Sequence, residues 1–169
     1  MSSPATAFDP RGLLAALDRH RVAYIIVGAF GRVVQGADEV TRGIDIVPSM
    51  REENLRRLDT ALAELGARQP DGSDPSLADA DRKQLEPVLE LATDHGELKI
   101  IPEPTGTGGY EDLRRAATRE HIGHGLRPQV ASLGDLTRML SSLGREQDLP
   151  KVLDLRRLAE LEISHGIEI

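Results

Sequence analysis

The sequence contains no cysteine and no tryptophan, and only two phenylalanines and two tyrosines among its 169 residues. Without cysteine, disulfides, zinc–thiolate sites and thiol nucleophiles are excluded. The shortage of aromatic side chains argues against a platform on which nucleic-acid bases stack. The formal net charge of −7 argues against wholesale electrostatic wrapping of nucleic acid, although it leaves room for a local basic surface.

Long apolar runs are also lacking. The longest, at 23–29, suits a buried strand that enters a turn, and it is far shorter than the run of about 20 residues that a membrane span needs. The first residues, 1–6, lack the basic and then apolar pattern of a signal peptide. We therefore expect a cytoplasmic protein without a membrane anchor. The length predicts a single domain with one core.

The hydrophobic periodicity predicts a mixed α/β (α+β) fold rather than a doubly wound parallel sheet, because one pair of strands reads as a hairpin. We expect a core over 1–131 and a C-terminal helical segment over 132–169 that packs on the same domain. In the first half of the chain, we expect a helix capped by Asp9 with Pro10 at its first position, a strand at 24–27, a short helix at 30–35, a strand at 44–47, and a helix that runs from a capping box at 49–52 to Gly66. An exposed loop at 67–84 and a hairpin of 88–92 and 97–101 follow. The last part should contain a helix at 110–118, a small hairpin of 121–122 and 129–130, a helix at 133–143 capped by Ser132, and a helix from Pro150.

The segment Val27-Gly28-Ala29 has a strand–glycine–helix pattern. Such a junction places free backbone N–H groups beside a ligand site and would suit a triphosphate. Taken alone, it is equally typical of a tight strand-to-helix turn. It is neither a P-loop nor a dinucleotide-binding glycine motif.

A second motif runs from Thr41 through Gly43 to Asp45. On a strand, residues 43 and 45 point to the same face, so two carboxylates there would share Mg²⁺ ions with a triphosphate. Gly43 supplies no ligand. Asp45 alone is sufficient for one Mg²⁺ that is also held by substrate phosphates; the alternative is an acid that caps a neighbouring helix.

The order of these motifs resembles the minimal nucleotidyltransferase-fold proteins of the AbiEii and MenT toxin type. Their usual form is Gly-Gly followed by Thr-x-Asp-hydrophobic-Asp. The resemblance covers most of the chain, and its order is more specific than any single piece. It is carried by Gly28-Ala29, residues 41–48, His95-Gly96-Glu97-Leu98-Lys99, residues 106–113, residues 130–136 and residues 144–149.

The resemblance implies a nucleotidyltransferase-like mixed sheet flanked by helices, and transfer of a nucleotide from an NTP, with Mg²⁺, to an RNA acceptor such as tRNA. It also implies a role in a toxin–antitoxin system, with a cognate antitoxin protein as partner. The implied nucleotide-binding residues are Gly28, Ala29, Thr41, Arg145 and Asp148, with Asp45 as the metal ligand and Asp45 and Lys99 as the catalytic residues.

Three positions depart from the family pattern. Gly43 replaces the first metal carboxylate, Lys99 stands where a third carboxylate is common, and Leu140 replaces a usual lysine. The Lys99 ammonium can partly replace a metal ion in holding an anion; the alternative is an edge-strand lysine that faces water. Glu97 lies on the same strand face as Lys99 and becomes a further candidate metal ligand if the register of the strand shifts.

Three functions remain open from the sequence. The first is an active nucleotidyltransferase-like toxin with a degenerate metal site. The second is a catalytically inactive member of the same fold that binds a nucleotide or a partner protein. The third is an interaction module that forms a homodimer through its C-terminal helices.

Overall fold

The structure, a computed structural model, describes residues 7–79 and 86–167, and side chains as far as residue 163. Its centre is a six-stranded mixed sheet with the strand order β3-β4-β2-β1-β6-β5. β1 runs antiparallel to β2 and parallel to β6, and β2 runs parallel to β4. The strands are β1 (Tyr24–Val27), β2 (Gly43–Pro48), β3 (Leu89–Thr93), β4 (Gly96–Ile100), β5 (Thr118–Arg119) and β6 (Gln129–Val130).

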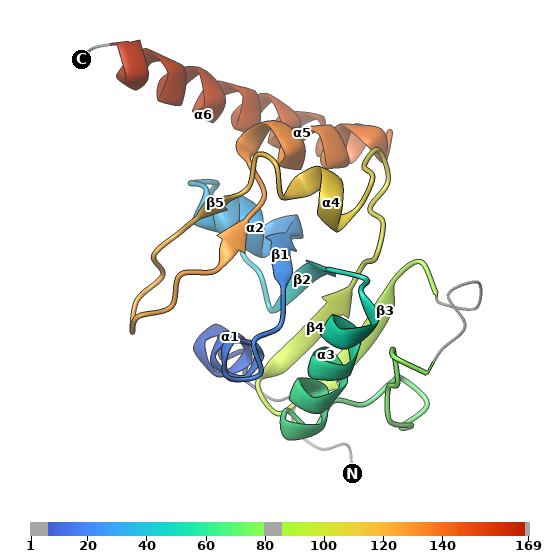
Figure 1. The fold of residues 1–169 in the computed structure, drawn as a ribbon. Coiled ribbons are helices and arrows are strands. Elements are labelled where there is room, and N and C mark those ends of the chain that lie inside the picture. The colour runs from blue at the N-terminus through green and yellow to red at the C-terminus, as the bar shows by residue number, and fades with distance from the viewer. Residues whose placement is uncertain (1–6, 80–85, 168–169) are drawn as a thin grey trace.

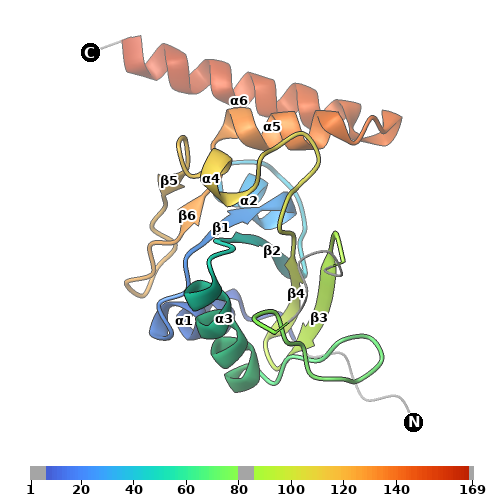
Figure 2. The same cartoon turned by 45° about the vertical axis from the view of Figure 1, so that its right-hand side comes forward.

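Helices lie on both sides of the sheet, with α1 and α3 on one side and α5 and α6 on the other (Figure 1). The second view shows α6 as the outermost element, running across α5 (Figure 2). The helices are α1 (Pro10–Arg19), α2 (Gly28–Val34), α3 (Glu52–Glu64), α4 (Tyr110–Leu113), α5 (Leu133–Ser142) and α6 (Leu149–Ile167), with a short 3₁₀ turn, η1, at Glu146–Asp148.

Strand alternation divides the buried side chains between the two faces of the sheet. The larger core joins the β1, β2 and β4 face that carries Ile26, Ile44 and Leu98 to α1 and α3. The opposite face, with Val27, packs against α4 and α5. A third cluster joins α5 to α6. The sheet is therefore covered on both faces near β1.

Most of the predicted elements are confirmed. Asp9 accepts a hydrogen bond from the Gly12 amide at 3.2 Å, with Pro10 as the first residue of α1, and Ser132 caps α5 through the Asp135 amide at 3.0 Å. The hairpin of β3 and β4 is present at the predicted place. The mixed sheet with C-terminal helices is the predicted fold class.

Three local predictions are wrong. No capping box opens α3, which begins at Glu52 after an Arg51 without a side-chain cap. The helix at 110–118 is only α4, because the backbone tightens into a turn onto the Leu113 carbonyl and then enters β5. The small hairpin pairs 118–119 rather than 121–122 with β6, since the positive φ angles of residues 123–125 give a longer loop.

Some predictions fall outside the described residues. They are the absence of a signal peptide at 1–6 and the end of the exposed loop, from residue 80 to residue 84. Within the described residues, no helix is long and apolar enough to cross a membrane.

Candidate functional site

The junction between β1 and α2 brings the Gly28 backbone directly against the Asp45 carboxylate. Gly28 has a φ of +68°, in the left-handed region that favours glycine. A Cβ atom at this position would lie within 2.9 Å of Cγ of Asp45. Both the backbone conformation and the close approach therefore require glycine here.

Asp45 lies in the middle of the sheet, on β2 between Val27 of β1 and Lys99 of β4. Burial raises the pKa of Asp45, and the positive charges of Lys99 and then Arg32 oppose that shift. A carboxylate held in this way has little water around it, so a cation brought by a ligand would stabilise its charged form.

Lys99 stands between two carboxylates on a strand that is inside the sheet. Its neighbours across the strands are Asp45 on β2 and Glu90 on β3. Its Nζ lies 4.0 Å from Oε1 of Glu90, and 42% of the side chain is exposed. The edge-strand part of the alternative is wrong, because β3 rather than β4 forms the edge of the sheet, although the Lys99 side chain does reach water.

Gly43 lies opposite Glu97 in the parallel register of β2 and β4. A Cβ atom at Gly43 would lie 2.7 Å from the Glu97 carbonyl oxygen and 2.9 Å from its Cβ. A carboxylate at position 43 would therefore require the two strands to separate. Thr41 donates a hydrogen bond to the Gly43 carbonyl at 2.8 Å and so stabilises the backbone at the start of β2.

A cleft of about 470 Å³ opens beside Asp45, between the strands and α5. It brings together five of the residues that the sequence singled out, namely Gly28, Ala29, Asp45, Lys99 and Arg145. Thr41 and Asp148 do not line it. Its remaining wall is largely apolar, and part of it comes from α5 and the residue after it, with Leu136, Met139, Leu140 and Leu143. The arrangement combines a charged floor with an apolar wall, as ligand clefts commonly do.

Asp148, which does not line the cleft, holds Arg145 in place. Its Nε donates to Oδ2 of Asp148 at 2.6 Å, and only 4% of the Asp148 side chain is exposed. The bond occupies one edge of the guanidinium and leaves terminal N–H groups for a ligand in the cleft. Asp148 is thus a positioning partner of Arg145.

The sequence reasoning missed an ion-pair network at the same cleft. Arg32 of α2 lines the cleft and donates to both carboxylate oxygens of Glu39, at 2.7 and 3.0 Å. Lys151 of α6 lies 3.4 Å from Glu39. Burial would raise the pKa of Glu39, but Arg32 and then Lys151 outweigh it and hold that pKa below its usual value. No local pattern indicates this network, since its members come from different segments.

A metal ion has few protein ligands at this cleft. Within 7–79 and 86–167, no group of three His, Asp or Glu side chains comes together to hold a metal. Asp45 and Glu90 both line the cleft, with Lys99 between them. Mg²⁺ often takes only one or two carboxylates and otherwise binds water and substrate phosphates. The residues therefore fit one Mg²⁺ carried in with a nucleotide rather than a two-ion site built by the protein.

Comparisons with known proteins identify the fold. No protein-family model matches the chain, and no curated protein matches it either. Among solved structures, the lincosamide antibiotic adenylyltransferase LnuA is similar over 90% of this chain and 99% of its own, with 16% identity and a TM-score of 0.59.

Two further structures agree with this result. A candidate nucleotidyltransferase from Thermotoga maritima covers 89% of each chain at 20% identity, with a TM-score of 0.55. The antibiotic-resistance factor ANT(2'')-Ia covers 90% of this chain and 81% of its own at 15% identity, with a TM-score of 0.56. The chain thus has the nucleotidyltransferase fold.

Proposed function

We propose that the cleft beside Asp45 binds a nucleoside triphosphate and that the protein transfers its nucleotidyl group to a hydroxyl acceptor. The observation that carries this proposal is the convergence of the Gly28 junction, Asp45, Lys99 and Arg145 on one cleft of a nucleotidyltransferase fold. Each of these residues comes from a different part of the chain, and each offers chemistry that suits phosphates.

The triphosphate is held mainly by charge. Lys99 and Arg145 line the cleft and would donate to phosphate oxygens, whereas the Arg32 guanidinium, which also lines it, is already paired with Glu39. Asp45 is the residue that would hold Mg²⁺, with Glu90 as the other carboxylate in reach of the cleft. When bound, Mg²⁺ offsets negative charge on the phosphates. The apolar α5 wall offers a surface for the base.

The transfer forms a bond between the acceptor oxygen and the α-phosphorus and breaks the bond from that phosphorus to the β-phosphate oxygen. The products are the nucleotidylated acceptor and pyrophosphate, and the hydroxyl proton passes to solvent. The protein contributes positioning and electrostatic stabilisation of the charge that develops on the phosphates.

The acceptor proposed here is an RNA, in particular tRNA, in a toxin–antitoxin system with a cognate antitoxin protein in the cytoplasm. This choice rests on the motif order that resembles AbiEii and MenT toxins. LnuA is a lincosamide antibiotic adenylyltransferase solved with lincomycin, and ANT(2'')-Ia has been solved with adenylyl-2''-tobramycin, so a small-molecule hydroxyl is the competing acceptor.

A second candidate is a nucleotide-binding member of the fold without catalytic activity. Two observations favour it: the strands leave no room for a carboxylate at Gly43, and Lys99 occupies the position opposite Asp45. In that case the cleft would hold a nucleotide through its cations alone.

The test is incubation of the purified protein with Mg²⁺, total tRNA and each labelled NTP in turn. We expect label on tRNA. The labelling rate should fall at least about 100-fold in Asp45→Ala, because the carboxylate that would hold Mg²⁺ beside the phosphates is then lost. The variant pair Arg56→Gln and Arg57→Gln is the matched control, since both residues form exposed ion pairs on α3, remote from the cleft lining.

The competing functions give different results. Binding of an NTP without transfer, unchanged by Asp45→Ala and weakened by Lys99→Gln, would select the inactive nucleotide-binding member. Label on lincomycin or tobramycin but not on RNA would replace the acceptor and keep the transferase.

A further inference from the structure

A second pocket lies at the other end of β1. The first residue of β1, Tyr24, lines it, whereas the last, Val27, lines the nucleotide cleft. The pocket measures about 470 Å³, within the range of about 300–1,000 Å³ that is usual for small-molecule sites. The two lining sets share no residue, so occupation of the cleft does not fill this pocket.

Three arginines from separate segments meet in this pocket, which we call the basic pocket. Arg21 belongs to the α1–β1 turn, Arg119 to β5, and Arg127 to the loop before β6. In the described part of the chain, none of the three guanidinium groups lies within 4.0 Å of a carboxylate, and Arg119 donates to the Arg127 carbonyl at 3.0 Å. Unpaired guanidinium groups that converge in a chain with a net charge of −7 indicate a site for an anion.

The other polar groups of the basic pocket suit a hydroxylated ligand. Both tyrosines of the chain, Tyr24 and Tyr110, line it together with Asp18. The buried Tyr24 phenol donates to Oδ1 of Asp18 at 3.2 Å. Burial, together with the adjacent carboxylate, raises the pKa of Tyr24, so the phenol keeps its proton. Asp18 retains lone pairs that can accept from ligand hydroxyls.

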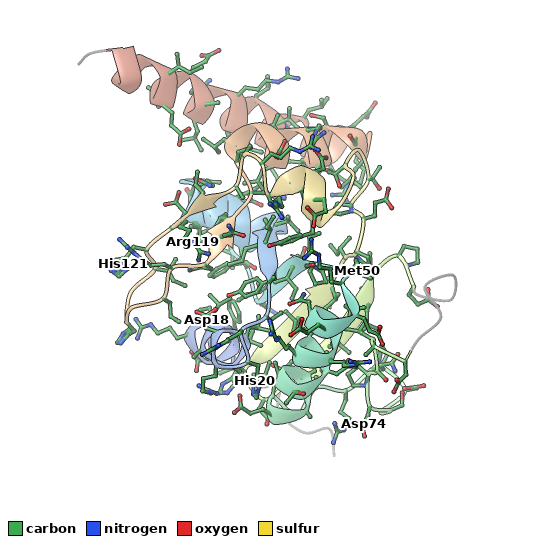
Figure 3. The ribbon with its side chains drawn as sticks, viewed as in Figure 1. Asp18, His20, Met50, Asp74, Arg119 and His121 are labelled. Atoms are coloured by element: carbon green, nitrogen blue, oxygen red, sulfur yellow. The ribbon has the colours of Figure 1, made fainter. Side chains whose placement is uncertain are left out.

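Figure 3 labels Asp18 on α1 and Arg119 on β5 on the same side of the molecule.

With three guanidinium groups and one carboxylate, the pocket carries two net positive charges. A phosphate monoester, with a charge of about −1.5 to −2 near neutral pH, offsets them almost completely. A phosphodiester carries a single negative charge and would leave part of the positive charge uncompensated.

We infer that the basic pocket is a second binding site, for the phosphate monoester of a small hydroxylated molecule such as a sugar phosphate. Arginine forks bind the phosphate oxygens through paired N–H groups, and the Asp18 carboxylate accepts from a hydroxyl of the carbon skeleton. This site does not depend on the proposed nucleotidyl transfer, because it uses none of the cleft residues.

The experiment is a calorimetric titration of the full chain with ribose 5-phosphate. We expect saturable binding that weakens at least about tenfold in Arg119→Gln/Arg127→Gln, since the variant loses charge-assisted hydrogen bonds to the phosphate. Lys99→Gln, which alters the cleft, and Arg56→Gln/Arg57→Gln, which removes the same charge from α3, should bind as the unchanged protein does. Ribose without phosphate should not bind.

For the double variant and its controls, three results would overturn the inference. They are no binding to the unchanged chain, equal weakening in the α3 control, and binding that is lost in Lys99→Gln but kept in the pocket variant. If the double variant fails to fold, Arg21→Gln and Arg119→Gln are measured singly, and unchanged affinity in both overturns the inference. A tetranucleotide without a terminal phosphate that binds better than ribose 5-phosphate would overturn the monoester assignment.

Discussion

At the scale of a single residue, the ionised Asp45 carboxylate lowers the stability of the fold, because it lies in the sheet with little water around it. Burial raises its pKa in the folded chain, with opposing contributions from Lys99 and Arg32. Such a group binds a proton more tightly in the folded than in the unfolded state, so its contribution to stability is full below the unfolded pKa and is lost as the pH rises through the folded pKa.

Asp45→Asn should therefore raise the melting temperature near neutral pH, where the Asp45 carboxyl of the unfolded chain is ionised. The gain should shrink as the pH falls through the unfolded pKa of about 3.9, because the wild-type residue then becomes protonated in both states. Melting curves of both proteins across this range measure the difference. A gain that stays constant, or that grows as the pH falls, would contradict the position of Asp45 in the sheet.

Gly43 is the second residue with a definite physical requirement. Gly43→Ala should destabilise the protein by about 1–3 kcal/mol, because its Cβ would press on the Glu97 backbone. Gly134→Ala is the matched control: its added Cβ would meet nothing closer than 3.9 Å inside α5, and it should be neutral or slightly stabilising. Chemical denaturation of the two variants measures the contrast, and equal stability would show that β2 and β4 can separate freely.

The sequence indicated some of these residues and not others. Gly28, Asp45 and Lys99 belong to short motifs whose order could be compared with known proteins, and the cleft brings them together. The pairing of Arg32 with Glu39 and Lys151 joins three separate segments, so no local spacing indicates it. The register of Gly43 against Glu97 depends on how β2 and β4 align, which two sequence segments read separately do not specify.

At the scale of elements, one buried side chain ties α3 to the sheet. Asn54 accepts from the Ala23 amide at 2.7 Å and donates to the carbonyls of Ala23 and Ser49 at 2.9 and 2.8 Å. It thereby satisfies backbone groups at the start of β1 and just after the end of β2. The residue replaces the expected capping box as the feature that positions α3.

Asn54→Leu should lower the free energy of unfolding by about 2–3 kcal/mol, since it leaves buried backbone groups without partners. Thr60→Ala, which removes an exposed hydrogen bond to the Arg56 carbonyl on the same helix, is the control and should change stability by less than about 0.5 kcal/mol. Urea denaturation of both variants compares them. Equal losses would mean that Asn54 does not tie α3 to the sheet.

Elements with strong local signals were predicted well. The Asp9 cap with Pro10, and the β3–β4 turn at Gly96, follow from short-range chemistry that acts in the isolated segment. The length of α4 and the place of β5 were predicted wrongly, because β5 is only two residues long and exists through its pairing with β6. Tertiary pairing rather than local preference decides such an element.

At the scale of the whole molecule, α6 leaves apolar side chains uncovered. Leu149, Leu153, Leu161 and Ile163 are each more than half exposed, whereas Leu155 of the same helix packs on α5. Figures 1 and 2 both show α6 as the outermost helix, with its C-terminal part extending past the body. At 3.6 residues per turn, Leu149, Leu153 and Leu161 lie on one side of α6, and such an exposed apolar strip is typical of a contact surface.

We predict that this strip of α6 forms a homodimer. Light scattering after gel filtration should give twice the chain mass, and Leu153→Glu/Leu161→Glu should give the monomer, because a charge cannot be buried there without a partner. Arg56→Glu on α3, an exposed position remote from α6, should leave the dimer intact. A monomer in the unchanged protein at micromolar concentration would rule the dimer out.

At the scale of the whole molecule, separate parts of the chain line one cleft, and we propose that this cleft is a single nucleotide site. Calorimetric titration with a non-hydrolysable analogue of each NTP in the presence of Mg²⁺ tests it most directly. We predict binding of at least one nucleotide, weakened at least about tenfold in both Lys99→Gln and Arg145→Gln, since each removes a charged contact, and unchanged in Arg56→Gln/Arg57→Gln. No binding of any nucleotide to the unchanged protein, or binding that neither cleft variant weakens, would contradict the claim.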